Sequence, residues 1–139
     1  MTTIALVQAA AAPAALGTSL WIAQGILFLV FTTTGFLKVS RPIPALVPMM
    51  SWVAETPTGL VRLIGVSELA GAAGVLLPSL TRIAPWLTPV AAVGLAIVML
   101  LAIPVHVKHH EVSRLGVPIL IGLLAAFVAW GRFYAVPLG

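Results

Sequence analysis

Glu68 carries the strongest chemical implication in this sequence, because it stands in the middle of an apolar stretch. Residues 60–77 include the run Leu-Ile-Gly-Val-Ser-Glu-Leu-Ala-Gly and hold no other acid. A carboxylate at the centre of a membrane-spanning helix costs about 2.5–3.5 kcal/mol on insertion scales. It must therefore face other helices, pair with a cation or take up a proton. We interpret Glu68 as a candidate ligand or proton site, with a purely structural contact between helices as the alternative.

The partners expected for Glu68 come from the ends of two other predicted helices. Lys38 ends the first, Thr34 lies one turn before it, and His106 lies near the end of the third. If these faces meet, Thr34, Lys38, Glu68 and His106 line a polar pocket that binds a cofactor, for which a quinone is the favoured candidate. Glu68 and His106 are the candidate catalytic residues, as donors or acceptors of a proton. For Lys38 and Arg62 taken singly, we favour a role as interfacial anchors whose charged ends reach water, and the alternative is that either bends inward to Glu68.

The other residues with chemical potential do not indicate a metal site or a familiar catalytic motif. His106, His109 and His110 lie close in sequence, but no ordered set of carboxylates accompanies them, so we predict no metal. The chain has no cysteine, which excludes disulfides, thiolate ligands and thiol catalysis. It also lacks a Gly-rich phosphate loop and the His-Glu-x-x-His pattern.

The composition identifies the environment in which these residues must act. Of the 139 residues, 61% are hydrophobic and only 7% are charged, and the mean hydropathy is +1.18. A soluble domain of this size could not bury so much apolar surface. An ordinary soluble enzyme and a disordered chain are therefore excluded. The net charge of +4 comes from residues at the ends of apolar runs and forms no dense patch, so we predict no nucleic-acid partner.

Four apolar runs must position the polar residues, since about 20 helical residues cross the hydrocarbon core. Prolines at 42, 44 and 48 are expected to prevent a regular helix in the 38–59 loop, and Pro78 is expected to end the second span. We predict an all-α, antiparallel four-helix bundle in the membrane. Its parts are an extramembrane or interfacial lead at 1–18, a transmembrane domain at 19–134 with spans at about 19–37, 60–77, 86–107 and 115–130, and a tail at 135–139.

The basic residues predict the orientation of this bundle. Five lie on the side of the 38–59 and 108–114 loops, and two lie on the side of both termini. Because cytoplasmic loops carry the excess of Lys and Arg, we predict a multi-pass protein of the inner, plasma membrane with both termini outside. The lead lacks the basic start of a signal peptide, which argues against its cleavage.

Several of these segments together resemble a known family. Gly-Phe-Leu-Lys closes the first span at Lys38, Gly-Val-Ser-Glu-Leu-Ala-Gly surrounds Glu68, and Pro-Trp-Leu-Thr-Pro opens a third span that leads to His106 and then Glu111. From Trp21 to Trp130, the arrangement resembles the DoxX-like family of small four-helix membrane proteins. The resemblance implies that Lys38, Glu68, His106 and Glu111 are the family's polar positions.

The resemblance and the residues together lead to two main functional hypotheses. The related DoxD branch is associated with thiosulfate:quinone oxidoreduction, and other members with membrane redox complexes. The first hypothesis is a quinone- or lipophile-binding subunit of a membrane redox system. The alternative is a non-enzymatic accessory or assembly subunit of a larger membrane complex, and a small transporter ranks third. The expected partners are the lipid bilayer, a hydrophobic small molecule, and a larger complex or further copies of the chain. Whether the chain is itself an enzyme stays open.

Overall fold

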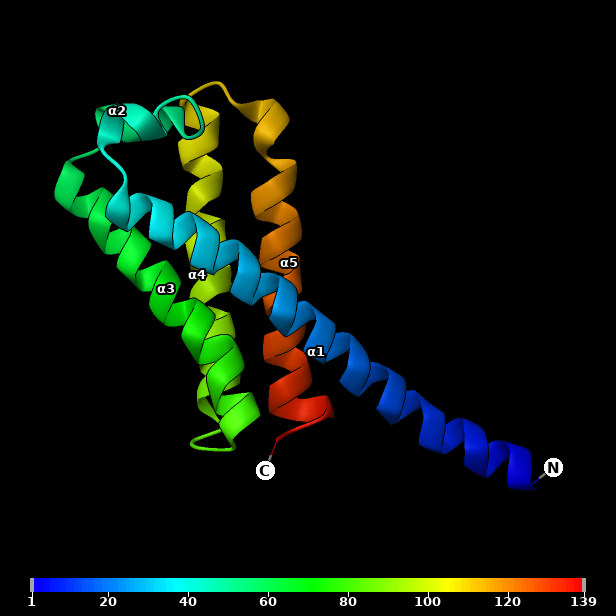
Figure 1. The fold of residues 1–139 in the computed structure, drawn as a ribbon. Coiled ribbons are helices and arrows are strands. Elements are labelled where there is room, and N and C mark those ends of the chain that lie inside the picture. The colour runs from blue at the N-terminus through cyan, green and yellow to red at the C-terminus, as the bar shows by residue number, and fades with distance from the viewer. Residues whose placement is uncertain (1, 139) are drawn as a thin grey trace.

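The computed structural model describes residues 2–138, in which four long helices run in alternating directions (Figure 1). These are α1 (Thr2–Ser40), α3 (Thr58–Thr81), α4 (Leu87–Lys108) and α5 (Gly116–Trp130). The turn η2 (Val112–Arg114) precedes α5 and a π-helical turn, η3 (Gly131–Ala135), follows it, so the last span covers Val112–Ala135. Each of the four spans is long and apolar enough to cross a membrane. The predicted all-α four-helix membrane bundle is confirmed.

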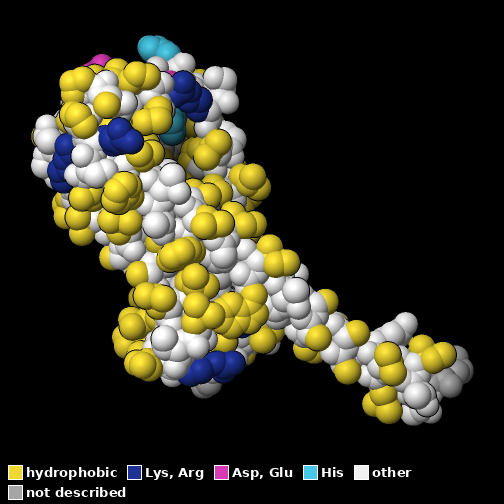
Figure 2. Space-filling model, in the orientation of Figure 1, with side chains coloured by type: hydrophobic (Ala, Val, Ile, Leu, Met, Phe, Trp, Pro, Cys, Tyr) yellow, Lys and Arg dark blue, Asp and Glu magenta, His cyan; other side chains and the backbone are white. Residues whose placement is uncertain are grey.

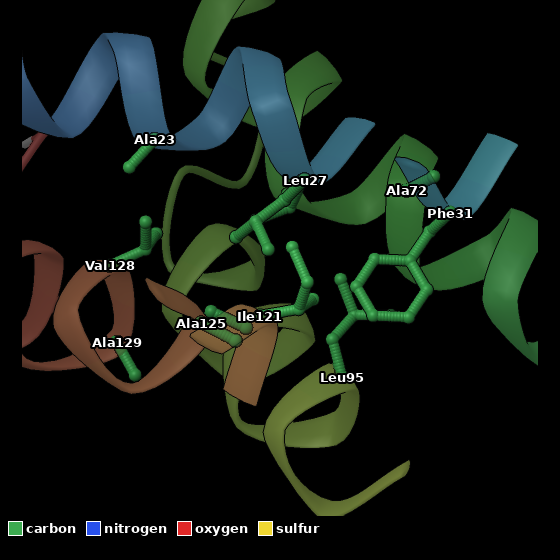
Figure 3. Close-up of a cluster of buried hydrophobic side chains, with 11 residues drawn as sticks. Ala23, Leu27, Phe31, Ala72, Leu95, Ile121, Ala125, Val128 and Ala129 are labelled. Atoms are coloured by element: carbon green, nitrogen blue, oxygen red, sulfur yellow. The ribbon is translucent and has the colours of Figure 1, made fainter. Parts of the chain in front are cut away.

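The helices pack in chain order around an apolar core. α1 lies against α3, α3 against α4, and α4 against α5, while contacts between α1 and α5 close the bundle. Leu27 and Phe31 of α1, Leu95 of α4, and Ile121 and Val128 of α5 meet at the centre (Figure 3). Because lipid covers the outside of such a bundle, close packing of these side chains holds the helices together.

The first part of α1 extends beyond the other helices, as Figure 1 shows. Residues 2–15 are exposed, and Leu20 is the first buried residue. The lead and the first span are thus one continuous helix, and its side chains become buried near the predicted start of the span. The location of the lead outside the bilayer stays a prediction.

The prediction that Pro78 ends the second span is wrong. α3 continues through Pro78 to Thr81, and Pro78 itself is buried in the bundle. Proline removes one backbone N–H from the helix, but neighbouring helices in a membrane protein can compensate for the loss. Here the side chain of Gln24 on α1 donates to the backbone oxygen of Val75 and to the hydroxyl of Ser79. These bonds fix the turn that contains the proline.

The proline-rich loop is also more regular than predicted. It contains a one-turn helix, α2 (Ile43–Leu46), and a 3₁₀ turn, η1 (Ser51–Glu55). Proline is tolerated in the first turn of a helix, where its missing N–H has no partner to lose, so Pro42 and Pro44 permit α2. Leu46 and Val53 are buried with Val61 of α3. The loop is therefore anchored over the end of the bundle where α1 ends and α3 begins (Figure 1).

Candidate functional site

The structure joins three of the four predicted pocket residues in one polar cluster, which we call the Lys38–Glu68 cluster and which consists of Thr34, Lys38 and Glu68. The Nζ atom of Lys38 donates hydrogen bonds of 2.8 Å to both carboxylate oxygens of Glu68. The hydroxyl of Thr34 donates to Oε2 of Glu68 at 3.2 Å. Lys38 is 6% exposed and Glu68 is 2% exposed. The cluster is a buried ion pair that links α1 to α3.

Helix geometry explains why these two side chains meet. A Cα–Cβ bond in a helix leans towards the N-terminus of that helix. α1 and α3 are antiparallel, so the Lys38 side chain leans into the bundle and the Glu68 side chain leans out towards the loop. A Cβ added at Gly65 would lie 2.8 Å from the Cβ of Lys38, and one added at Gly35 would lie 2.8 Å from the backbone oxygen of Gly65. The two glycines therefore allow the close approach that an ion pair between helix faces requires.

The structure pairs Arg62 with the end of α1 rather than with Glu68. Its guanidinium group donates to the backbone oxygen of Lys38. That oxygen lies in the last turn of α1, where carbonyl groups lack a partner within the helix. Arg62 thus caps α1 and holds the backbone of Lys38 against α3.

The cluster retains one chemical capacity that the ion pair does not use. A lysine ammonium carries three N–H donors, and Glu68 accepts two of them. The third N–H of Lys38 can donate a charge-assisted hydrogen bond to an oxygen of another molecule. The Glu68 carboxylate can accept a proton from the Lys38 ammonium, because each carboxylate oxygen has more than one lone pair.

His106 does not join this cluster, contrary to the predicted pocket of four residues. Its Nδ1 atom lies 2.8 Å from Oε2 of Glu111. The other oxygen of Glu111 accepts a 2.6 Å hydrogen bond from the hydroxyl of Ser51 in η1, and Arg114 lies 3.4 Å from that same oxygen. Arg114 also donates to the backbone oxygen of Met49. His106 is thus part of a clasp between the proline-rich loop and the α4–α5 connection, which we call the Glu111 clasp.

The Glu111 clasp favours an ionised carboxylate. The hydrogen bond from Ser51, and after it the one from His106, lower the pKa of Glu111 below its ordinary value. An ionised carboxylate only accepts hydrogen bonds, so Nδ1 of His106 must carry the proton it shares with Glu111. His106 is therefore bonded to Glu111 and lies apart from the buried ion pair.

Two apolar hollows on the bundle lie away from the Lys38–Glu68 cluster. One is a groove of about 450 Å³ between α4 and α5, lined by residues such as Ile97, Leu100 and Leu123. The other, of about 240 Å³, lies between α3 and α4 and is lined by residues such as Ser67, Gly71 and Leu95. Neither is lined by Thr34, Lys38 or Glu68. The side chains of the Lys38–Glu68 cluster are therefore packed against each other and do not line either hollow.

Residues 2–138 contain no group of side chains suited to bind a metal ion. The described His and Glu residues form no group of three that could hold an ion. His109 lies 3.8 Å from Glu55, while His106 is bonded to Glu111.

A second buried polar cluster, which the sequence analysis did not identify, lies at the opposite end of the bundle. Besides its two donated bonds, Gln24 accepts a 2.8 Å hydrogen bond from Nε of Arg132 in η3. The hydroxyls of Ser79 and Thr88 lie 2.8 Å apart. All four side chains are buried. Isolated polar residues on apolar helix faces are the signal in the sequence, where Arg132 is one of the two basic residues on the side of the termini.

A comparison with known protein families matches most of the chain to one of them. The family model described as the DoxX-like family covers residues 22–128. The chain belongs to the DoxX-like family. The search of curated proteins and the search of solved structures gave no match to this DoxX-like chain.

The four polar positions that the resemblance implied fall into two pairs in this DoxX-like fold. Lys38 and Glu68 form the buried pair between α1 and α3, and His106 and Glu111 form the partly buried pair at the end of α4. Of these, the first pair is enclosed within membrane-spanning helices. This buried pair is therefore the candidate functional site.

Proposed function

We propose that this DoxX-like protein is a lipophile-binding subunit of a membrane redox system, with a quinone-type molecule as the ligand and Lys38 and Glu68 as the binding residues. The observation that supports the proposal is the third N–H donor of the Lys38 ammonium. It lies in an apolar bundle beside a carboxylate that has accepted the other two. A carbonyl oxygen on a hydrophobic ring is the acceptor that suits such a donor.

The energetics of the ion pair favour a functional role. Replacing a buried ion pair by well-packed apolar residues is often neutral or stabilising, so burial of the pair is weak evidence for a role in stability. Ionisable residues within membrane spans most often mark ligand or proton pathways. Two of the three acids in the chain lie near loops, and Glu68 alone is placed inside a span.

The chemistry assigned to the chain is binding and proton supply. Lys38 would donate a hydrogen bond to the ligand oxygen, and the charge of Lys38 would stabilise negative charge there. Glu68 would hold the ammonium in place and exchange a proton with it. The quinone supplies the redox chemistry when bound, and its electrons come from other proteins of the system.

Access to Lys38 requires only a local movement. Lys38 lies two residues before the end of α1 and keeps 6% of its surface exposed. Its four-carbon stem can turn towards the end of the helix without a change in the backbone. Glu68 is shorter and deeper, so the mobile partner of the pair is the lysine.

A non-enzymatic accessory subunit is the second candidate, and a specific observation favours it. The Lys38–Glu68 cluster is closed, and the exposed start of α1 extends from the bundle as a helix without contacts of its own within the described chain (Figure 1). In this alternative, the ion pair stabilises the contact between α1 and α3. The free part of α1 would bind a larger complex or another copy of the chain.

Gentle-detergent purification from the native membrane, followed by mass spectrometry of co-purified proteins and extracted lipophiles, separates the two candidates. Four forms of the full chain are compared: wild type, Glu68→Gln, the apolar double variant Lys38→Met/Glu68→Leu, and Ser67→Ala as control. Ser67 is exposed on the same helix, and its hydroxyl bonds only to the backbone oxygen of Leu63.

The proposal predicts a quinone-type lipophile at about one per chain in wild type and Ser67→Ala. The double variant should be as well folded as wild type and should lose this molecule. A lipophile retained in equal amount by the folded double variant would overturn the proposal. Large protein partners with no retained lipophile in any form would favour the accessory role.

A further inference from the structure

The second polar cluster contains a positive charge for which the described chain provides no counter-ion. Arg132 is 4% exposed. Its Nε donates to Gln24 and its Nη1 donates to the backbone oxygen of Val136 at 3.2 Å, but its buried Nη2 has no partner. A buried guanidinium N–H without an acceptor costs free energy, so an acceptor bound at Nη2 would stabilise this end of the bundle.

A second arginine adds to this charge. Arg82, at the end of α3, donates to the backbone oxygen of Leu138 at 3.0 Å. Residues 136–138 thus supply neutral carbonyl acceptors to both guanidinium groups. Within residues 2–138, each acid is engaged elsewhere: Glu68 with Lys38, Glu111 with His106, and Glu55 near His109. Two cations therefore share one end of the bundle without a carboxylate.

The surroundings place these arginines at the level of lipid headgroups. Trp86, Trp130 and Tyr134 lie at the same end and are 62%, 51% and 78% exposed. Exposed Trp and Tyr gather where a membrane protein crosses from hydrocarbon to water. The ring of Trp21 lies 5.1 Å from the guanidinium carbon of Arg132, which orients the group by a cation–π contact. In Figure 2, Lys and Arg side chains also appear at the end of the bundle away from α2.

We infer that Arg132 and Arg82 form a site for a phosphate-type anion at this end of the bundle, and that the anion is supplied by the headgroup of an acidic phospholipid. Arginine presents several N–H donors in a planar fork that matches the oxygens of a phosphate. Nη2 of Arg132 would donate to one oxygen, and Arg82 would exchange its neutral carbonyl partner for a charged one. The site is distinct from the Lys38–Glu68 cluster and does not depend on the function proposed above.

Thermal unfolding of the purified full chain in neutral phosphatidylcholine micelles tests this site. Phosphatidylglycerol is added at increasing mole fraction in one arm, and inorganic phosphate is added in another. Arg82→Gln is the main variant because Arg82 is exposed, so its loss should not prevent folding. Arg41→Gln removes the same charge at the opposite end, where Arg41 is also exposed. Arg132→Lys keeps the positive charge but removes the planar guanidinium group with its several N–H donors.

Phosphatidylglycerol is expected to stabilise wild type and Arg41→Gln with the same half-saturating mole fraction. Arg82→Gln should need about ten times more lipid, the effect of losing one charge-assisted hydrogen bond, and Arg132→Lys should shift in the same direction. Stabilisation by inorganic phosphate alone at similar concentration would keep the anion site but assign it to a soluble ligand. If neither additive stabilises wild type, or if Arg82→Gln responds like wild type, the inference is wrong.

Discussion

Removing one partner of the Lys38–Glu68 pair should destabilise the bundle more than removing both. Both side chains are almost fully buried, and each single substitution leaves the remaining charge without its counter-ion. Breaking a buried ion pair costs about 3–5 kcal/mol. Lys38 lies near the end of α1 and can turn its ammonium towards water, so we expect Glu68→Leu to cost about 3 kcal/mol, at the low end. Lys38→Met should cost at least as much, because Glu68 is deeper and has no such escape.

The double variant Lys38→Met/Glu68→Leu should unfold with a free energy within about 1 kcal/mol of wild type, since apolar residues of similar volume often replace such a pair without loss. The coupling energy is the change in the double variant minus the sum of the single changes. Its magnitude should be at least about 5 kcal/mol, because the single changes sum to about 6 kcal/mol or more and the double change is about 1 kcal/mol or less.

Reversible unfolding in mixed micelles of mild detergent and dodecyl sulfate gives these free energies, with the fluorescence of the four tryptophans as the signal. A loss of about 3 kcal/mol lowers the ratio of folded to unfolded protein by about 100-fold. Ser67→Ala should remain within about 0.5 kcal/mol of wild type. Single variants as stable as wild type, or a double variant as unstable as the sum of its parts, would refute the reasoning about the pair.

Two further predictions follow from the helix contacts and from the Glu111 clasp. Gly35→Ala should destabilise the fold by about 1–3 kcal/mol, because the new methyl group would meet the rigid backbone oxygen of Gly65. Gly94→Ala, where nothing lies within 4 Å, should be neutral or stabilising in the same unfolding assay. Glu111 has a pKa below its ordinary value of 4.5, mainly through Ser51, so the clasp should contribute stability above that value and lose it as the pH falls through the lower value. Protease cleavage within the proline-rich loop should therefore rise on acidification in wild type, whereas a Glu111→Gln variant that shows the same pH profile would contradict this assignment.

The four-helix membrane bundle could be predicted because its signals are long and repetitive. Each span needs only a run of apolar residues, and the composition leaves few other ways to fold. The local errors came from interactions with other helices. Pro78 lies inside α3, in a turn to which the side chain of Gln24, 54 positions earlier, donates two hydrogen bonds.

The candidate site was predictable in part for the same reason. Glu68 is a single acid in an apolar span, so it needs a partner, and Lys38 at the end of an antiparallel neighbour is within its reach. His106 was assigned to the wrong group because the sequence does not show that the proline-rich loop brings Ser51 to Glu111. Arg132 was missed because its burial depends on Gln24, which is distant in sequence.

Infrared difference spectroscopy with a carbonyl-labelled short-chain quinone tests most directly whether Lys38 and Glu68 bind a lipophile. The quinone is titrated into wild type and into the folded double variant Lys38→Met/Glu68→Leu, in the same micelles. Hydrogen bonding to Lys38 predicts a lowered carbonyl frequency in wild type, a perturbed carboxylate band, and neither change in the variant. The same carbonyl band in both proteins would contradict the proposed binding site.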